Sequence, residues 1–312
     1  MTADPPPSVL CLMGPTATGK TDLAVALAER WPVEIVSVDS ALVYREMDIG
    51  TAKPGPEVLA RAPHRLIDLV DPAESYSAAC FVRDAVAAIR EIRAAGRVPL
   101  LVGGTGLYFK ALQEGLSELP PADADFRAAF EARRRREGLE ALHAELARVD
   151  PDTAARIRPG DPQRIQRALE VHALTGTPMS ALLRRRRPAL DARFVNLVLT
   201  AERSWLRERI ALRFERMLAA GFLEEVARLR ARGDLRPEMP SMRAVGYRQA
   251  WRYLAGETDF DRFRQEAVHA TRRYAKRQAT WFRHQVEGMR LDARAPGLAD
   301  RAAEVFGLHD SS

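Results

Sequence analysis

A phosphate-binding motif near the N-terminus constrains the fold of this chain more than any other stretch. The motif reads Gly14-Pro15-Thr16-Ala17-Thr18-Gly19-Lys20-Thr21, and it lies between an apolar run at 9–13 and a helical pattern at 22–30. A strand, a tight loop and a helix in this order surround an anion with backbone N–H groups, because glycine tolerates the curled backbone. Lys20 adds a positive charge toward the outer phosphate, and the hydroxyl of Thr21 is placed to ligate Mg²⁺. The motif predicts a bound diphosphate or triphosphate, without specifying the molecule that carries it.

Alternating strand and helix patterns predict that the motif belongs to a parallel sheet. The apolar stretch 33–38 ends at Asp39, and the stretches 66–70 and 98–102 are typical of further buried strands. A helical pattern at 78–95 separates the last two. Ligands of parallel α/β sheets bind at the carboxyl ends of the strands. We therefore predict an α/β fold, a P-loop-type parallel sheet flanked by helices, with Asp39 at the strand ends that face the phosphate loop.

The strand pattern is interrupted by a helical region. Between residues 121 and 194 the patterns are helical and are broken by prolines and glycines, and a strand pattern returns at 194–199. We predict three parts: residues 1–120 as the first part of the core, 121–194 as an inserted all-helical domain, and 195–312 as the rest of the core with basic C-terminal helices. The last part includes a long amphipathic helix over 260–282, whose aromatic residues are more typical of core than of base stacking.

Basic residues are concentrated downstream of the phosphate loop. The net charge is +6, but residues 1–120 carry −4, residues 121–195 carry +4 and residues 196–312 carry +6. A basic surface of this extent favours a polyanionic partner, although charge alone does not establish one. The arginine clusters at 133–136 and 184–187 are typical of solvated helix faces, whereas the segment 163–167 lies at a predicted helix start that suits phosphate.

Composition predicts a soluble protein. The chain has 312 residues, 46% of them hydrophobic, and no apolar run approaches the roughly 18 residues of a membrane span. The first seven residues lack the apolar core of a signal peptide, so we expect a cytoplasmic protein with no membrane partner. Separately, we expect a monomer. Cys11 and Cys80 lie in apolar stretches and are expected to be buried thiols, and the histidines form no metal-ligand pattern.

Several ordered motifs over about residues 8–290 resemble the tRNA dimethylallyltransferase family, whose members prenylate the adenosine 3′ to the anticodon. The resemblance rests on the phosphate loop, on Ser37-Val38-Asp39-Ser40, and on the stretch from Tyr44-Arg45-Glu46 to Ala52-Lys53-Pro54. It continues through Gly103-Gly104-Thr105-Gly106-Leu107-Tyr108, Asp161-Pro162-Gln163-Arg164, Val245-Gly246-Tyr247-Arg248 and Lys276-Arg277-Gln278-Ala279-Thr280-Trp281-Phe282-Arg283. Leu42 departs from the pattern, because many members carry glutamine there.

The resemblance implies a reaction and a set of site residues. A dimethylallyl group would pass from dimethylallyl diphosphate to the 6-amino group of adenosine in the tRNA anticodon stem-loop, with Mg²⁺ bound through Thr21. The diphosphate would be bound by Gly14, Thr16, Ala17, Thr18, Gly19, Lys20 and Thr21, and Asp39, Thr105 and Arg213 would be catalytic. Contacts with tRNA would come from Asp39, Ser40, Ala41, Leu42, Thr105, Arg127, Gln163, Arg164, Ile165, Gln166, Arg167, Arg243, Ala244, Val245, Gly246, Tyr247, Arg248, Lys276, Arg277, Gln278, Ala279, Thr280, Trp281, Phe282 and Arg283.

The chemistry of this reaction agrees with the residue types. The exocyclic amine of adenine is a poor nucleophile, so a carboxylate such as Asp39 that accepts its proton assists the attack. The leaving diphosphate accumulates negative charge, which N–H groups, Lys20, Mg²⁺ and Arg213 would stabilise. A second interpretation of Asp39 is that it positions Mg²⁺ through water.

Two other functions fit parts of the sequence. A nucleotide-kinase-type phosphotransferase would share the loop and the sheet but has little use for so large a basic region. A non-catalytic RNA-binding protein would explain the basic region, but it would not need an intact loop with Lys20, Thr21 and Asp39.

Overall fold

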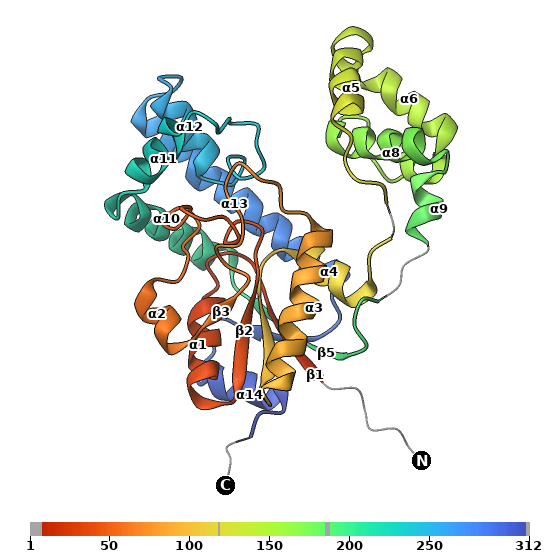
Figure 1. The fold of residues 1–312 in the computed structure, drawn as a ribbon. Coiled ribbons are helices and arrows are strands. Elements are labelled where there is room, and N and C mark those ends of the chain that lie inside the picture. The colour runs from red at the N-terminus through yellow and green to blue at the C-terminus, as the bar shows by residue number, and fades with distance from the viewer. Residues whose placement is uncertain (1–7, 118, 185–187, 310–312) are drawn as a thin grey trace, which may run out of the picture. The chain divides into compact units, whose positions relative to one another are not determined.

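The structure, a computed structural model, describes residues 8–117, 119–184 and 188–309 (Figure 1). It divides into two compact units, one formed by Met1–Gln113 with Leu190–Ser312 and the other by Glu114–Ala189. The predicted arginine cluster at 184–187 falls largely outside the described residues, with only Arg184 inside them.

All strands of the first unit belong to one parallel sheet. Within the described residues, six strands follow the order β3-β2-β4-β1-β5-β6, and each neighbouring pair is parallel. Met13 on β1 and Val38 on β2 are both level with Gly103 on β4, so these strands end together. The parallel α/β prediction is confirmed. The strands are β1 (Ser8–Met13), β2 (Val33–Val38), β3 (His64–Arg65), β4 (Val98–Gly103), β5 (Arg193–Thr200) and β6 (Met289–Asp292).

Among the described residues of the first unit, two hydrophobic clusters lie next to the helices that flank the site. One core lies between the sheet, α1 and α14, and it includes Leu12, Leu27 and Phe306. The other joins α10 to α13 with the segment after β2, and it includes Tyr44, Phe222 and Tyr247. The helices are α1 (Lys20–Arg30), α2 (Pro56–Arg61), α3 (Ala78–Ala94), α4 (Gly106–Glu114), α10 (Arg203–Ala219), α11 (Phe222–Ala231), α12 (Tyr247–Leu254), α13 (Phe260–Gln285) and α14 (Leu298–Phe306).

Two predictions for this unit are corrected. The expected strand at 66–70 is mainly loop, and β3 is the shorter pair His64–Arg65, because Leu66 and Asp68 have φ of 62° and 53°. Positive φ is incompatible with an extended strand. Cys11 is buried as expected, but Cys80 is only half-buried, at the first turn of α3. Both thiols are free.

The second unit is all-helical and has a core of its own. Phe130, Leu142, Leu146 and Ile165 are buried together in it. Arginines of the cluster at 133–136 form ion pairs with Glu131, Glu137 and Glu145 on helix surfaces. The unit begins and ends a few residues earlier than 121–194, because Arg193 already belongs to β5. Its helices are α5 (Ala124–Glu137), α6 (Leu139–Val149), α7 (Pro151–Ala154), α8 (Pro162–Thr175) and α9 (Met179–Leu183).

Candidate active site

The phosphate loop has the backbone of an anion site. It connects β1 to α1, with Ala17 at φ 66° and Gly19 at φ 83°. A positive φ at a non-glycine residue such as Ala17 is uncommon and turns successive N–H groups toward one side. Gly19 caps α1 without a side-chain hydrogen bond, so no side chain competes there for the N–H groups of the first turn. Such a helix N-terminus attracts phosphate.

Lys20 lies over this loop with an altered pKa. Its Nζ donates to the carbonyl oxygen of Pro15 at 2.7 Å. Burial lowers the pKa of Lys20 to about 7, while the carboxylate of Asp39 raises it and Arg213 lowers it further. A bound phosphate favours the ammonium form, so above pH 7 binding must bring a proton to Lys20. Phosphate affinity should therefore fall as the pH rises above about 7, and the contribution of Lys20 should be constant below it.

We expect inorganic pyrophosphate to bind with proton uptake at about pH 8. Calorimetry in two buffers with different ionisation enthalpies measures this uptake. Lys20→Met is the control, because the ionisation of pyrophosphate itself contributes equally to both proteins. Wild type should take up more protons than Lys20→Met, and the same uptake by both proteins would contradict the lowered pKa.

Two arginines of α10 contact the loop. Arg213 donates from Nη1 to the hydroxyl of Thr16 and from Nη2 to the carbonyl of Thr51, both at 3.3 Å. Arg209 donates from Nε to the carbonyl of Ala17 at 3.0 Å, with its guanidinium 4.8 Å from the ring centroid of Trp205. Arg209 is a site residue that was not predicted from the sequence. Its spacing of four residues from Arg213 places both on one helix face, and this signal could have found it.

Asp39 and Thr105 lie where two neighbouring strands end. Asp39 follows β2 and accepts the N–H of Ala41 on Oδ1 at 2.8 Å. The hydroxyl of Thr105, after β4, accepts the N–H of Ser40 at 3.1 Å. The carboxylate of Asp39 raises the pKa of Lys20 and opposes the lowering of the pKa of Arg213 by burial. One carboxylate therefore interacts with the cations Lys20 and Arg213 at the phosphate loop, and Thr105 fixes the backbone beside it.

Helix α13, although distant in sequence, contacts both the phosphate loop and the segment after β4. Gln278 accepts the N–H of Thr16 on Oε1 and donates from Nε2 to the carbonyl of Gly104, both at 2.9 Å. A Cβ on Gly106 would lie 2.3 Å from the ring of Trp281, so only glycine allows this ring to approach. Burial raises the pKa of Tyr274 and so does Asp39, while a hydrogen bond with Thr105 opposes the shift.

Comparison with known proteins assigns the family. A family model described as IPP transferase matches residues 42–285, and one described as isopentenyl transferase matches residues 7–68. The chain belongs to the IPP transferase family. It is 62% identical to a tRNA dimethylallyltransferase of Thioalkalivibrio sulfidiphilus, covering 89% of this chain and 87% of the relative. It is 58% identical to a tRNA dimethylallyltransferase of Cupriavidus necator, covering 96% of this chain and 95% of the relative.

Solved structures of similar proteins agree with this family assignment. A tRNA isopentenylpyrophosphate transferase from Bacillus halodurans matches with a TM-score of 0.69 and 38% identity, covering 96% of this chain and 94% of that one. A eukaryotic dimethylallyltransferase acting on tRNA matches with a TM-score of 0.81 and 25% identity, covering 97% and 78%. Membership of the IPP transferase family confirms the predicted resemblance and makes the chain a prenyltransferase, against both the kinase and the non-catalytic alternatives.

The residues predicted to bind tRNA differ widely in exposure. Most of the charged ones, together with Gln163, are exposed, which keeps them available for RNA: Arg127, Arg164, Arg243, Arg248, Lys276, Arg277 and Arg283. Ser40 and Thr280 are also exposed. The remaining ones are half-buried: Asp39, Ala41, Leu42, Thr105, Gln166, Arg167, Ala244, Val245, Ala279 and Trp281.

Several residues predicted to contact tRNA are buried in the structure. Ile165 packs in the core of the helical unit, and Tyr247 in the core of α10 to α13. Phe282 is 1% exposed and Gln278 is 7% exposed, with its amide bound to Thr16 and Gly104. The backbone of Gly246 is also covered.

Arg127 and Arg167 have a structural partner. Both bind the buried carboxylate of Glu170, at 2.8 Å and 2.6 Å. Glu170 also accepts the N–H of Asp123 at 2.9 Å. Because a buried carboxylate must be paired, these arginines stabilise the helical unit whether or not RNA is bound.

The site has few protein ligands for a metal. Among the described residues, no group of three or more histidine, cysteine, aspartate or glutamate side chains could hold a metal ion. Thr21 is exposed at the start of α1.

In the described part of the chain, no helix has the length and apolarity needed to cross a membrane.

Proposed function

We propose that this chain transfers the dimethylallyl group of dimethylallyl diphosphate to the 6-amino group of the adenosine 3′ to the anticodon of tRNA, and releases diphosphate. The observation that carries the proposal is the position of Asp39. Its carboxylate acts on Lys20 of the phosphate loop and on Arg213 of α10, and it lies at a strand end beside Thr105. A base and a leaving-group site thus occur together.

The phosphate loop would bind the donor diphosphate. The N–H groups of the loop, Lys20, Arg213 and Arg209 would stabilise the charge that develops as the allylic C–O bond breaks and its electron pair passes to diphosphate. The donor set fits Mg²⁺, which is commonly held by one or two protein oxygens together with substrate phosphates. We propose that the hydroxyl of Thr21 contributes one such oxygen, and that the ion neutralises phosphate charge when bound.

Asp39 would act on the acceptor. The nitrogen of the 6-amino group forms the new bond to the allylic carbon, and the proton that it loses passes to the carboxylate of Asp39. Thr105 would orient the strand ends around the reacting atoms through its hydrogen bond to the N–H of Ser40. The adenosine must leave its stack to reach this position.

The exposed cations would bind the RNA. On the first unit these are Arg243 and Arg248 near the start of α12, and Lys276, Arg277 and Arg283 on α13. In the helical unit, the side chains of Gln163 and Arg164 are exposed in the first turn of α8 and suit phosphate, whereas the N–H of Arg164 is donated to the capping carboxylate of Asp161 at 3.1 Å. We propose that the helical unit grips the anticodon stem-loop.

One assay separates this function from a phosphotransferase. Bulk tRNA is incubated with the protein and radiolabelled dimethylallyl diphosphate, and in parallel with ATP labelled in its terminal phosphate. We expect label from the prenyl donor in RNA, and no transfer from ATP. Transfer of phosphate from ATP without prenylation of RNA would refute the proposed function.

A further inference from the structure

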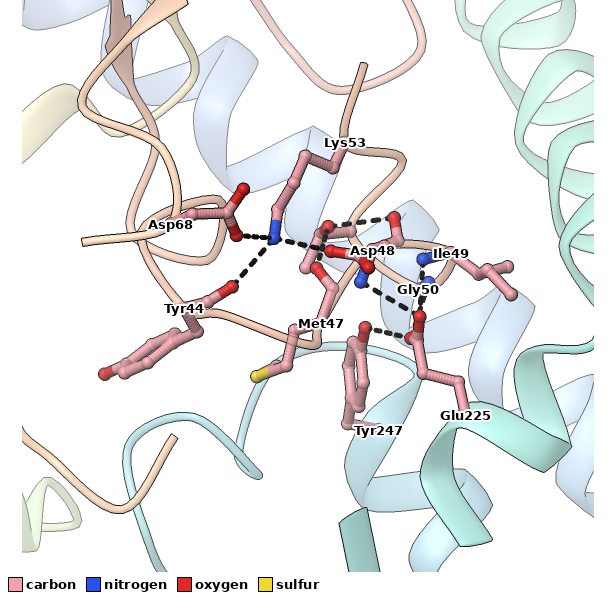
Figure 2. A network of polar contacts seen from close by, with 10 residues as sticks. Tyr44, Met47, Asp48, Ile49, Gly50, Lys53, Asp68, Glu225 and Tyr247 are labelled. Atoms are coloured by element: carbon pink, nitrogen blue, oxygen red, sulfur yellow. Dashed lines mark hydrogen bonds and ion pairs between the residues drawn. The ribbon is translucent and has the colours of Figure 1, made fainter. Parts of the chain in front are cut away.

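One motif of the sequence has no part in the proposed chemistry. The stretch 44–54 forms a loop between β2 and α2, and a buried carboxylate lies beneath it. This carboxylate belongs to Glu225 in the first turn of α11, and the residue is 2% exposed. Figure 2 shows Glu225 pointing at the backbone of Asp48, Ile49 and Gly50, with the side chain of Tyr247 beside it.

Four donors converge on the carboxylate of Glu225. Its Oε2 accepts the N–H groups of Asp48 at 2.9 Å and Ile49 at 2.7 Å. Its Oε1 accepts the N–H of Gly50 at 3.1 Å and the hydroxyl of Tyr247 at 2.5 Å. A carboxylate has about four acceptor sites, so this one is fully used. Burial raises the pKa of Tyr247 and the charge of Glu225 raises it further, which keeps its hydroxyl protonated as a donor.

Side-chain packing and a lysine fix the same loop. A Cβ on Gly50 would lie 2.3 Å from the ring of Phe222 and 2.6 Å from that of Tyr247, so the backbone lies directly on α11 and α12. Lys53 donates from Nζ to the carbonyl of Tyr44 at 2.8 Å and pairs with Asp48 and Asp68 (Figure 2). The loop therefore has one well-defined backbone path.

The next carbonyl along this path binds a residue of the active site. Thr51 follows the three N–H groups held by Glu225, and its carbonyl accepts Nη2 of Arg213 at 3.3 Å. The other amino group of Arg213 donates to the hydroxyl of Thr16 in the phosphate loop. A continuous chain of contacts thus leads from Glu225, through the loop backbone, to the guanidinium at the phosphate site.

We propose that Glu225 is a positioning residue for the transfer reaction. It fixes residues 47–53 of the loop 44–54, so that Thr51 holds Arg213 toward the diphosphate. This inference rests on the proposed function, because it uses the diphosphate role of Arg213. Glu225 itself does not touch the substrate. Its effect should therefore disappear when Arg213 is absent.

A double-mutant cycle tests this dependence. The ligand is inorganic pyrophosphate, measured by calorimetry, and the variants are Glu225→Gln, Arg213→Ala and the double variant. Glutamine retains the size of the side chain but presents an NH₂ group to N–H donors. We expect Glu225→Gln to weaken pyrophosphate binding about 10-fold in wild type and less than about twofold in the Arg213→Ala background, since residues in one hydrogen-bond network are not additive. Single-turnover transfer should show the same non-additivity.

The control is Glu224→Gln, one residue earlier on α11 and exposed. It should leave pyrophosphate affinity unchanged. If Glu225→Gln reduced pyrophosphate affinity equally in wild type and in the Arg213→Ala background, the proposal would be overturned, because a general structural role does not depend on Arg213.

A second variant keeps the test decisive if Glu225→Gln does not fold, as judged by circular dichroism. Tyr247→Phe removes one of the four donors and leaves the three N–H groups in place. Tyr247→Phe should reduce pyrophosphate affinity by less than Glu225→Gln does, and this reduction should again disappear in the Arg213→Ala background. An equal reduction of pyrophosphate affinity in both backgrounds would overturn the proposal. Pyrophosphate binding needs no prenyl transfer, so failure of this inference and failure of the proposed function are distinguishable.

Discussion

The Asp39→Asn variant is expected to transfer the dimethylallyl group about 10²–10⁴-fold more slowly than wild type in a single turnover, the usual contribution of a positioned general base. Asparagine retains the shape of the side chain and can still accept the N–H of Ala41, but it cannot take the amine proton. Donor binding should remain close to normal, because the phosphate loop and its contacts with Arg213 and Gln278 are unchanged.

A Mg²⁺ titration distinguishes the two interpretations of Asp39. If Asp39 is the base, the deficit should be the same at every Mg²⁺ concentration. If it positions the metal instead, excess Mg²⁺ should restore much of the rate, and the variant should require more metal and more donor together. Recovery at high Mg²⁺ would exclude the role of Asp39 as base.

Deletion of the helical unit is expected to raise the dissociation constant of tRNA roughly 100-fold, the equivalent of two lost charge-assisted hydrogen bonds at about 1.5 kcal/mol each. The deletion removes 116–188 and joins the ends with a glycine-serine bridge. All strands described belong to the other unit, so the sheet should survive. Filter binding across a salt series measures both the affinity and its salt dependence.

The salt dependence carries the sharper test. Each lost phosphate contact should reduce the slope of log affinity against log salt by about 0.7–0.9. Pyrophosphate binding serves as the control for folding, since the phosphate loop is retained. A deletion variant that binds pyrophosphate normally and shows the wild-type salt slope would exclude the helical unit as an RNA grip.

The parts of the site that are local in sequence were predictable. The phosphate loop joins a strand directly to a helix, and Asp39 follows an apolar strand, so pattern and spacing were sufficient for both. The β3 prediction failed because the apolar stretch 66–70 contains two residues with positive φ, which hydrophobicity does not reveal. Family resemblance supplied Thr105 and Arg213, whose roles have no local signal.

Contacts between distant segments could not be read from the sequence. Gln278 lies 262 residues after Thr16, and its place in a basic helix led to the prediction that it binds RNA. Glu225 is one of two adjacent glutamates at a helix start, a pattern typical of exposed positions. Only the packing of α11 against the loop 47–53 shows that Glu225 is buried and Glu224 is exposed.

The most direct test of the proposed chemistry is to locate the product. Wild-type protein and Asp39→Asn are each incubated with tRNA, dimethylallyl diphosphate and Mg²⁺ for one wild-type turnover time, and the RNA is digested and sequenced by mass spectrometry. We predict a dimethylallyl group on the 6-amino nitrogen of the adenosine 3′ to the anticodon with wild type, and almost none with Asp39→Asn. Prenylation at another nucleotide, or equal product from both proteins, would contradict the account.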